Sequence, residues 1–216
     1  MELRIEKYLV QLERWPKKGK YILAQYDEKS VIVYQAYRSS IGHFAAENKY
    51  FGGEFSLSRM SWIKPNFLWM MYRCGWAMKE GQEVVLAIKM KREGFETILS
   101  NAVHSSFQNK LYQSQAEWQK ALKHSDVRLQ WDPDHDPMGN KQQRRAIQLG
   151  LSGKTLELYS KEWIIDITDI SEFVREQREN IHCEHHSKLV TPLEQIYPLD
   201  NELARQLRAS YVEKMI

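Results

Sequence analysis

The sequence predicts a single domain of the α+β class, with a central, mainly antiparallel sheet flanked by helices. Its 216 residues suffice for one domain, and a chain of this size buries about 70% of its unfolded surface in one core. Apolar residues make up 43% of the chain and charged residues 27%, which are ordinary globular values. Stretches rich in β-branched and aromatic residues alternate with stretches of helical periodicity, so both kinds of element contribute to the core.

The start of the chain is expected to be a helix added to this domain. Between residues 2 and 15, Ile5, Leu9 and Leu12 recur at helical spacing, and Pro16 ends the pattern. The predicted division of the chain is a helical extension, one α+β domain and a C-terminal tail: 1–20, 21–198 and 199–216.

Six strands are expected from β-branched, aromatic and alternating apolar residues. They are Tyr21–Gln25, Val31–Tyr37, Glu83–Met90, Val127–Trp131, Ala146–Leu151 and Trp163–Ile167. Glu83–Met90 is apolar on both faces, which predicts a central strand. The strands on either side of the polar loop Asp132–Gly139 are expected to form a long hairpin, and Phe55–Ser58 to be a short extended piece.

Five further helices are expected, and one of them is distinctive. They span residues 39–48, 65–74, 92–105, 114–123 and 170–180, and Ser114 with Glu117 forms a capping box at the start of the fourth. The helix at 65–74 is apolar on nearly every side, which predicts that it is buried. Arg73 lies within it. Because burying an unpaired guanidinium is costly, we expect Arg73 to meet a carboxylate, such as Asp132 or Asp134, or to face a wet cleft.

Charge and cysteine content restrict the partners and the compartment. The net charge of +3 comes from 31 basic and 28 acidic residues spread along the chain, so a nucleic-acid partner is compatible with the sequence but not indicated by a basic stripe. The longest apolar run, Phe67–Met71, is too short to cross a bilayer, and we expect no membrane partner. Cys74 and Cys183 form no disulfide framework, which favours a reducing compartment and hence the cytoplasm. The oligomeric state is left open.

Two groups of residues offer metal-binding side chains, yet we expect no metal. They are Asp132, Asp134, His135 and Asp136 in the polar loop, and His182, Cys183, His185 and His186 near the end of the chain. Neither spacing matches an EF-hand or zinc motif. Turn chemistry explains the first group and a solvated tail the second. Nucleophile-elbow, P-loop and dinucleotide-binding glycine motifs do not occur in the sequence.

The remaining polar residues fall at strand ends and on the apolar helix. The candidate site residues are Gln35, Tyr37, Arg38, Ser56, Ser58, Arg59, Trp62, Lys64, Arg73, Trp131, Asp132, Arg145 and Gln148. Guanidinium and ammonium groups bind phosphate, amides bind hydroxyls, and indole and phenol rings stack on bases, so this set is typical of a nucleotide site. An equally weighted alternative is that the Arg and Trp residues stabilise the edge of the domain.

Four stretches resemble the domain-of-unknown-function family 4291. They are Val33–Tyr37, Arg59–Trp76, Val127–Pro133 and Ala146–Gly153. The resemblance covers about Tyr21 to Pro198, leaving the first helix as an extension, and it implies no activity.

A fainter resemblance is to ADP-ribosyltransferases, which implies a split sheet and the use of NAD. In this resemblance, Val33–Arg38 is similar to the early strand, Phe55–Ser58 to the serine motif, and Gln148 stands in the late position. It implies that Arg38 binds phosphate, that Ser58 supports a strand, that Trp62 or Tyr37 stacks on a base, and that Gln148 holds the ribose. The family's late glutamate is missing, so Arg38 and Gln148 are the candidate catalytic residues. The alternative is a non-catalytic RNA or nucleotide binder, in which Arg59, Lys64, Arg73 and Arg145 hold phosphates.

Overall fold

The first of two main sheets has a central strand that is buried on both faces. The computed structural model describes residues 1–182 and 186–210. Three antiparallel strands lie in the order β10 (Ile164–Asp169), β6 (Val84–Lys91) and β4 (Ser30–Tyr37). Side chains alternate across β6, so Leu86 belongs to one hydrophobic cluster and Val85 to another. The predicted central position of this strand is confirmed.

The second sheet is built on a long hairpin. β8 (Val127–His135) and β9 (Lys141–Leu151) pair antiparallel. Three short strands complete the sheet: β2 (Gly19–Lys20) beside β9, β7 (Ala102–His104) beside β8, and β5 (Ser61–Ile63), which also pairs with β9. The predicted hairpin is confirmed, but it is longer than expected, because strand pairing continues through Asp132 to His135.

The two sheets meet at one backbone bridge between Tyr34 of β4 and Lys64, which follows β5. The Tyr34 amide donates to the Lys64 carbonyl at 2.7 Å, and the Lys64 amide donates to the Tyr34 carbonyl at 3.2 Å. The α+β class with mainly antiparallel pairing is therefore confirmed, with the strands divided between two sheets that join at this bridge.

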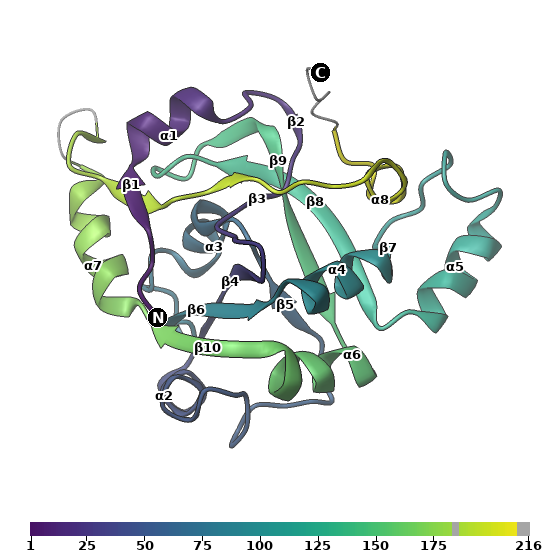
Figure 1. The fold of residues 1–216 in the computed structure, drawn as a ribbon, viewed down its shortest axis with the longest axis horizontal. Coiled ribbons are helices and arrows are strands. Elements are labelled where there is room, and N and C mark those ends of the chain that lie inside the picture. Colours follow the sequence, from purple (N-terminus) through teal and green to yellow (C-terminus); the bar gives the residue numbers. More distant parts are fainter. Residues whose placement is uncertain (183–185, 211–216) are drawn as a thin grey trace.

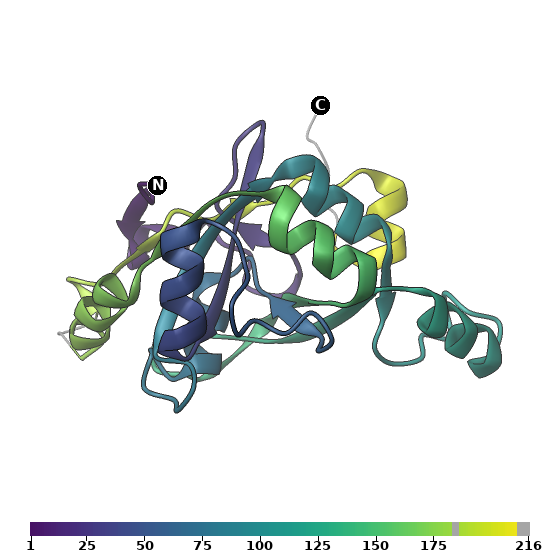
Figure 2. The same cartoon turned by 90° about the horizontal axis from the view of Figure 1, so that it is seen from below.

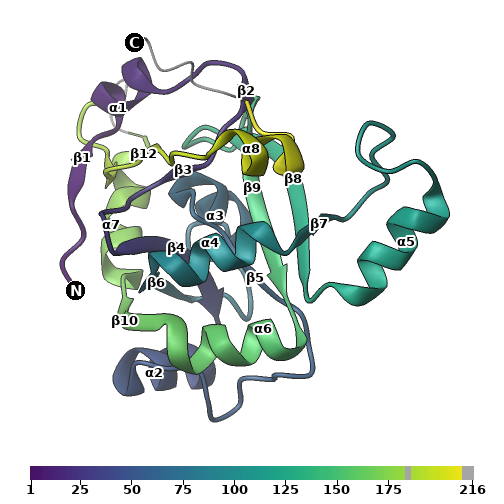
Figure 3. The same cartoon turned by 45° about the vertical axis from the view of Figure 1, so that its right-hand side comes forward.

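Helices cover both sheets. They are α1 (Tyr8–Arg14), α2 (Ser39–Asn48), α3 (Phe67–Cys74), α4 (Arg92–Ser100), α5 (Gln115–His124), α6 (Gly153–Leu158) continued by the π-helical turn η1 (Tyr159–Trp163), α7 (Ser171–Asn180) and α8 (Asn201–Leu207). Figures 2 and 3 show that α5 stands out from the rest of the molecule, and none of its residues is buried. As predicted, Ser114 caps α5 by accepting a hydrogen bond from the Glu117 amide.

The N-terminal segment corrects the first expected helix. Ile5–Lys7 forms β1, which pairs with β11 (Val190–Pro192), and the helix begins only at Tyr8 (Figure 1). The helical spacing is real but local, and pairing with a strand more than 180 residues away overrides it. A second such pair joins β3 (Leu23–Ala24) to β12 (Gln195–Ile196).

Three other expectations are also corrected. The helix expected through residue 105 ends at Ser100, because Ala102–His104 pairs with β8. Phe55–Ser58 forms no strand, and Leu57 and Ser58 lie in a turn. The helix at 65–74 is not apolar all round, since Tyr72 and Arg73 are exposed. Among the described residues, no helix has the length and apolar character needed to cross a membrane.

The start and end of α3 follow from its flanking residues. Asn66 caps the helix by accepting a hydrogen bond of 2.7 Å from the Trp69 amide, so Pro65 lies just outside it. Gly75 ends it in the left-handed conformation, with φ +57°. Glu194, from the C-terminal segment, accepts hydrogen bonds from the Phe67 amide and from Asn66 Nδ2. These contacts fix the helix that forms one wall of the candidate site.

Candidate functional site

A cleft of about 820 Å³ lies where the two sheets meet. Its walls come from β4, β5, α3 and the β8–β9 hairpin, together with residues 54–60. Most of the residues predicted from the sequence to form a site line it: Gln35, Tyr37, Arg38, Ser56, Arg59, Trp62, Lys64, Arg73, Asp132 and Gln148. These residues span more than 110 positions of the chain, and only the folding of the two sheets brings them together.

Gln35 forms the rigid floor of the cleft. Its Nε2 donates to Tyr37 Oη at 2.7 Å and to Ser61 Oγ at 2.8 Å, while its Oε1 accepts a hydrogen bond of 2.8 Å from Tyr159 Oη. Tyr37 and Ser61 share a further hydrogen bond of 2.7 Å. Burial raises the pKa of Tyr37 and of Tyr159 above the ordinary value, so both phenols stay protonated. This network satisfies Gln35 and the phenol of Tyr37 internally, and it positions β4 against β5.

Lys64 is a buried cation that faces the cleft. Its backbone forms the bridge to Tyr34, the residue is only 5% exposed, and no described residue forms a hydrogen bond or ion pair with its ammonium group. Burial, together with the positive charge of Arg73, lowers the pKa of Lys64 to about 8, although Asp132 opposes the shift. A lysine held in this way carries a charge near neutral pH that the protein leaves uncompensated, which is a property of anion-binding and reactive lysines.

Arg73 and Arg59 are exposed side chains that line the cleft. The expectation that Arg73 is buried is therefore wrong. Of the two alternatives given for it, a carboxylate partner or a position facing a cleft, the structure shows the second. Neither of the expected carboxylates pairs with Arg73, and no other described residue does so. Arg38 also lines the cleft, but it pairs with Glu54 at 2.6 Å, and both side chains are more than half exposed.

Asp132 is a carboxylate of the cleft that is held in place by two amides. Gln130 and Asp132 lie two residues apart on β8, and Gln130 faces Gln148 across the hairpin. Asp132 Oδ1 accepts a hydrogen bond of 2.9 Å from Gln130, and Oδ2 accepts one of 2.7 Å from Gln148. The two amides therefore hold the carboxylate in one orientation while it lines the same cavity as Lys64. A fixed negative charge beside cations can bind a hydroxyl or stabilise a developing positive charge.

Two indoles supply apolar surface. Trp62 lies on β5 opposite Gly150 of β9, and a Cβ at Gly150 would approach the Trp62 ring to 3.0 Å. Gly150 thus allows the indole to lie flat on the hairpin. Trp69 is buried, and no described residue accepts a hydrogen bond from its Nε1. Both residues line the cleft. The Trp62 ring suits a planar ligand, whereas the Trp69 ring is already stacked on Tyr72 and His135.

Three of the predicted site residues lie outside the cleft. Ser58 is in the exposed turn, where its hydroxyl bonds to Ser56 at 3.0 Å, so it supports no strand. Trp131 and Arg145 line a separate cavity of about 350 Å³. Arg145 was expected in the same site as Gln148, but the two residues are three positions apart along one strand, which places their side chains on opposite faces of the sheet.

Several residues that line the cleft were not among those predicted from the sequence. Ser61, Trp69, Gln130 and Glu54 all line the cleft. Gln130 could have been found, because it alternates with Asp132 along an expected strand and therefore shares its face. Nothing in the sequence around Glu54 indicated a place in the site, since its role depends on Arg38 being nearby in the folded protein.

The two suspected metal-binding groups have different outcomes. In the polar loop, Asp134 forms a buried ion pair of 2.6 Å with Arg144, whose guanidinium also donates to the Pro16 carbonyl and lies over the Trp15 ring. Asp136 accepts hydrogen bonds from Asn140. Within the described ranges, no group of three or more metal-binding side chains converges. In the second group, Cys183 and His185 lie outside the described residues.

Comparison with protein families gives a match over most of the chain. The profile of the family described as "Domain of unknown function (DUF4291)" matches residues 21–197. No protein of curated function matches the chain. The match covers every residue of the cleft, while β1 and α1 precede it.

Proposed function

We propose that this chain, which belongs to the DUF4291 family, is a nucleotide-using transferase that binds NAD in the cleft and transfers its ADP-ribosyl group to an acceptor. One observation carries the proposal. A carboxylate, Asp132, is held by two amides in the same cavity as an unpaired buried lysine, Lys64. A dinucleotide needs both features, a cationic region for its pyrophosphate and a fixed polar group for its ribose.

The cationic side of the cleft suits the pyrophosphate. Among the residues that the structure describes, neither the ammonium group of Lys64 nor the guanidinium of Arg73 has a partner. Arg59 and Arg38 also line the cleft, and Arg38 is paired with Glu54. The mutual repulsion of Lys64 and Arg73 would be relieved by a bound anion.

Asp132 supports the transfer step. The bond between ribose C1′ and the nicotinamide nitrogen would break with its electron pair leaving on nicotinamide, and positive charge would develop on the ribose. A preorganised carboxylate stabilises such a charge, and an amide such as Gln148 can hold a ribose hydroxyl. An acceptor nucleophile would then bond to C1′ and lose a proton. The late glutamate of ADP-ribosyltransferases is missing from this chain, and the proposal assigns its negative charge to Asp132 on the neighbouring strand.

Trp62 and Trp69 support recognition of the rings. Trp62 is only partly buried in the cleft, so its face is available for stacking. The Trp69 indole N–H is buried without a described acceptor, and a carboxamide or phosphate oxygen of a ligand would satisfy it. Tyr37 is assigned no stacking role, because its ring packs edge-on against Phe51 and Phe55.

The second candidate function is non-catalytic binding of RNA or a nucleotide. It is favoured by the cations Arg59, Lys64 and Arg73, which would serve a phosphodiester as well as a pyrophosphate. Two measurements on the purified protein distinguish the two functions. One is the release of nicotinamide during incubation with NAD, and the other is the binding of NAD and of RNA, measured by calorimetry. Release that the Asp132→Asn variant loses supports the transferase. Salt-dependent binding of RNA without any turnover of NAD supports the binder, and a protein that neither binds nor cleaves NAD contradicts the transferase.

A further inference from the structure

A second cavity lies on the other side of the hairpin wall. It has a volume of about 350 Å³ and is lined by Lys20, His104, Ser105, Ser106, Trp131 and Arg145, among others. Gln130 lines both this cavity and the main cleft. Trp131 is fixed in the wall, because its Nε1 donates a hydrogen bond of 2.8 Å to the Leu207 carbonyl.

Cations are gathered here at an energetic cost. Lys20 on β2 and Arg145 on β9 are direct register partners in parallel strands, so their side chains leave the sheet side by side. Like charges in that arrangement destabilise a sheet. Arg208 does not line the cavity itself, but its guanidinium donates a hydrogen bond to Gln108, which does. Burial lowers the pKa of Lys20, and the charges of Arg208 and Arg145 act in the same direction. Among the described residues, no carboxylate forms an ion pair with any of these three cations.

His104 adds a neutral donor or acceptor at the back of the cavity. It is only 5% exposed, and its Nε2 lies 3.2 Å from the Gln206 carbonyl. Burial lowers the pKa of His104 to about 4, and the charges of Lys20 and Arg208 act in the same direction. The imidazole is therefore uncharged at neutral pH, with Nε2–H donating to the carbonyl. The positive charge of the cavity comes from Lys20, Arg145 and Arg208.

We propose that this second cavity is a phosphate-binding site, in which Lys20, Arg145 and Arg208 neutralise the anion and the hydroxyls of Ser105 and Ser106 donate to it. A phosphate group would convert a destabilising cluster of like charges into a set of charge-assisted hydrogen bonds. The proposal is independent of NAD binding, because it rests on residues outside the main cleft. The phosphate could belong to a small phosphorylated molecule or to a nucleic-acid strand, and both offer the same oxygen atoms to the cavity.

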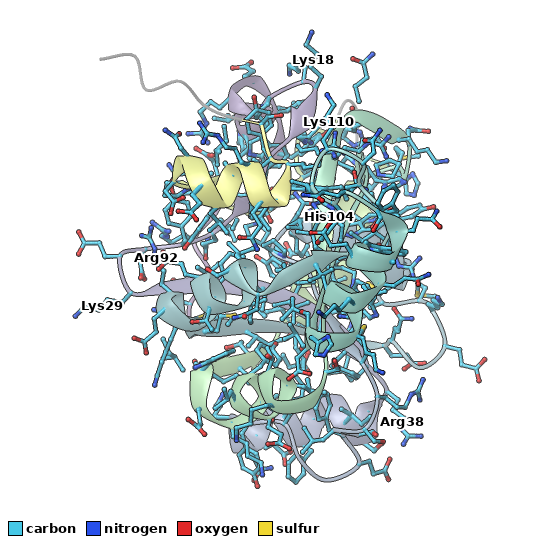
Figure 4. All side chains as sticks on the ribbon, turned by 90° about the vertical axis from the view of Figure 1, so that its right-hand side faces the viewer. Lys18, Lys29, Arg38, Arg92, His104 and Lys110 are labelled. Carbon is cyan, nitrogen blue, oxygen red and sulfur yellow. The ribbon has the colours of Figure 1, made fainter. Side chains whose placement is uncertain are left out.

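Titration with inorganic phosphate and pyrophosphate tests the site. Binding is measured by calorimetry and by the imidazole resonances of His104, whose pKa should rise when an anion enters the cavity. We expect Lys20→Gln and Arg145→Gln each to weaken, at least fivefold, the pyrophosphate binding that shifts the His104 resonances, and the double variant to abolish that shift. Pyrophosphate held by Lys64 and Arg73 in the main cleft should leave these resonances unchanged. Lys29→Gln is the matched control, since it removes one positive charge from an exposed turn that Figure 4 shows well away from His104.

Thermal unfolding without ligand distinguishes a binding site from a structural cluster. Removing one of two like charges should leave the melting temperature of Arg145→Gln unchanged or raise it. The proposal is overturned if millimolar pyrophosphate does not shift the His104 resonances of the wild-type protein, or if both cavity variants show the same shift as Lys29→Gln does. Two competitors then identify the source of the phosphate. Displacement of pyrophosphate by a single-stranded oligoribonucleotide indicates a nucleic-acid strand, and displacement by nucleoside monophosphates alone indicates a small molecule.

Discussion

Gln148 donates a hydrogen bond of 2.7 Å from Nε2 to Oδ2 of Asp132, joining the two strands of the β8–β9 hairpin on the face that lines the main cleft. The two residues are 16 positions apart, and Gln130 holds the other carboxylate oxygen. These two hydrogen bonds preorganise the carboxylate. They also fix a negative charge in the cleft, opposite in sign to the charges of Lys64 and Arg73.

Asp132→Asn should reduce turnover far more than binding. The substitution keeps the size of the side chain but removes the negative charge that would stabilise the ribosyl cation. We expect the rate of nicotinamide release to fall about 100-fold or more, with the Kd for ADP-ribose changed by less than about threefold. Glu179→Gln, which removes an exposed acidic group on α7, should change neither value. Equal loss of binding and turnover in Asp132→Asn would argue for a purely structural carboxylate.

Binding of an anionic ligand should weaken as pH rises through 8. Burial and Arg73 lower the pKa of Lys64 to about 8, so the ammonium group loses its proton between pH 7 and 9. If only the protonated form binds phosphate, affinity for ADP-ribose falls about tenfold across this interval. Calorimetry at several pH values measures the change. Lys64→Met should bind more weakly and show no midpoint near pH 8, whereas an unchanged pH profile in this variant would exclude Lys64 from the phosphate site.

The same pKa determines how stability depends on pH. The folded pKa of Lys64 lies below its ordinary value of 10.5, so between pH 8 and 10.5 the unfolded chain binds more protons than the folded one. Wild-type stability, measured relative to Lys64→Met, should therefore rise with pH through this window. Urea unfolding of the two proteins at pH 7.5 and pH 10 provides the comparison, and a relative loss of stability at pH 10 would contradict the assignment.

Arg73→Lys should keep the fold and weaken nucleotide binding by about 1 to 3 kcal/mol, because an ammonium group cannot reproduce the paired donors of a guanidinium. Arg73 is exposed and has no partner among the described residues, so the melting temperature of the Arg73→Lys variant should match that of the wild type. Arg205→Lys, at an exposed position of α8, is the matched control for the chemical change. A sharp loss of melting temperature with unchanged affinity for ADP-ribose would make Arg73 a structural residue.

Asp134→Asn should destabilise the protein by about 3 to 5 kcal/mol, because it leaves the charge of Arg144 buried without its carboxylate. The pair is almost inaccessible, with side-chain exposures of 4% and 1%. Glu157→Gln, which breaks an exposed pair with Lys154, should cost less than about 1 kcal/mol. In urea unfolding, the double variant Asp134→Leu, Arg144→Met should be more stable than Asp134→Asn. If it is not, the loss does not come from an unpaired charge.

Much of the fold was open to prediction because it depends on neighbours in the sequence. The hairpin of β8 and β9, the capping box of Ser114 and Glu117, and the Gly75 end of α3 are all local features, and the structure confirms each of them. Most of the candidate residues also meet in one cleft. Their meeting could be anticipated because polar residues at strand ends and beside a largely buried helix need solvent or a partner.

The other features could be seen only in the folded protein, because pairing between distant segments overrides local periodicity and fixes the face on which each side chain lies. The sequence alone allowed prediction of the α+β class, the central strand β6 and a set of candidate site residues rich in arginine and tryptophan. It did not determine that Ile5–Lys7 would pair with Val190–Pro192 as a strand. Nor did it determine that Arg145 would stand beside Lys20, away from Gln148, because that depends on the parallel register of β2 against β9.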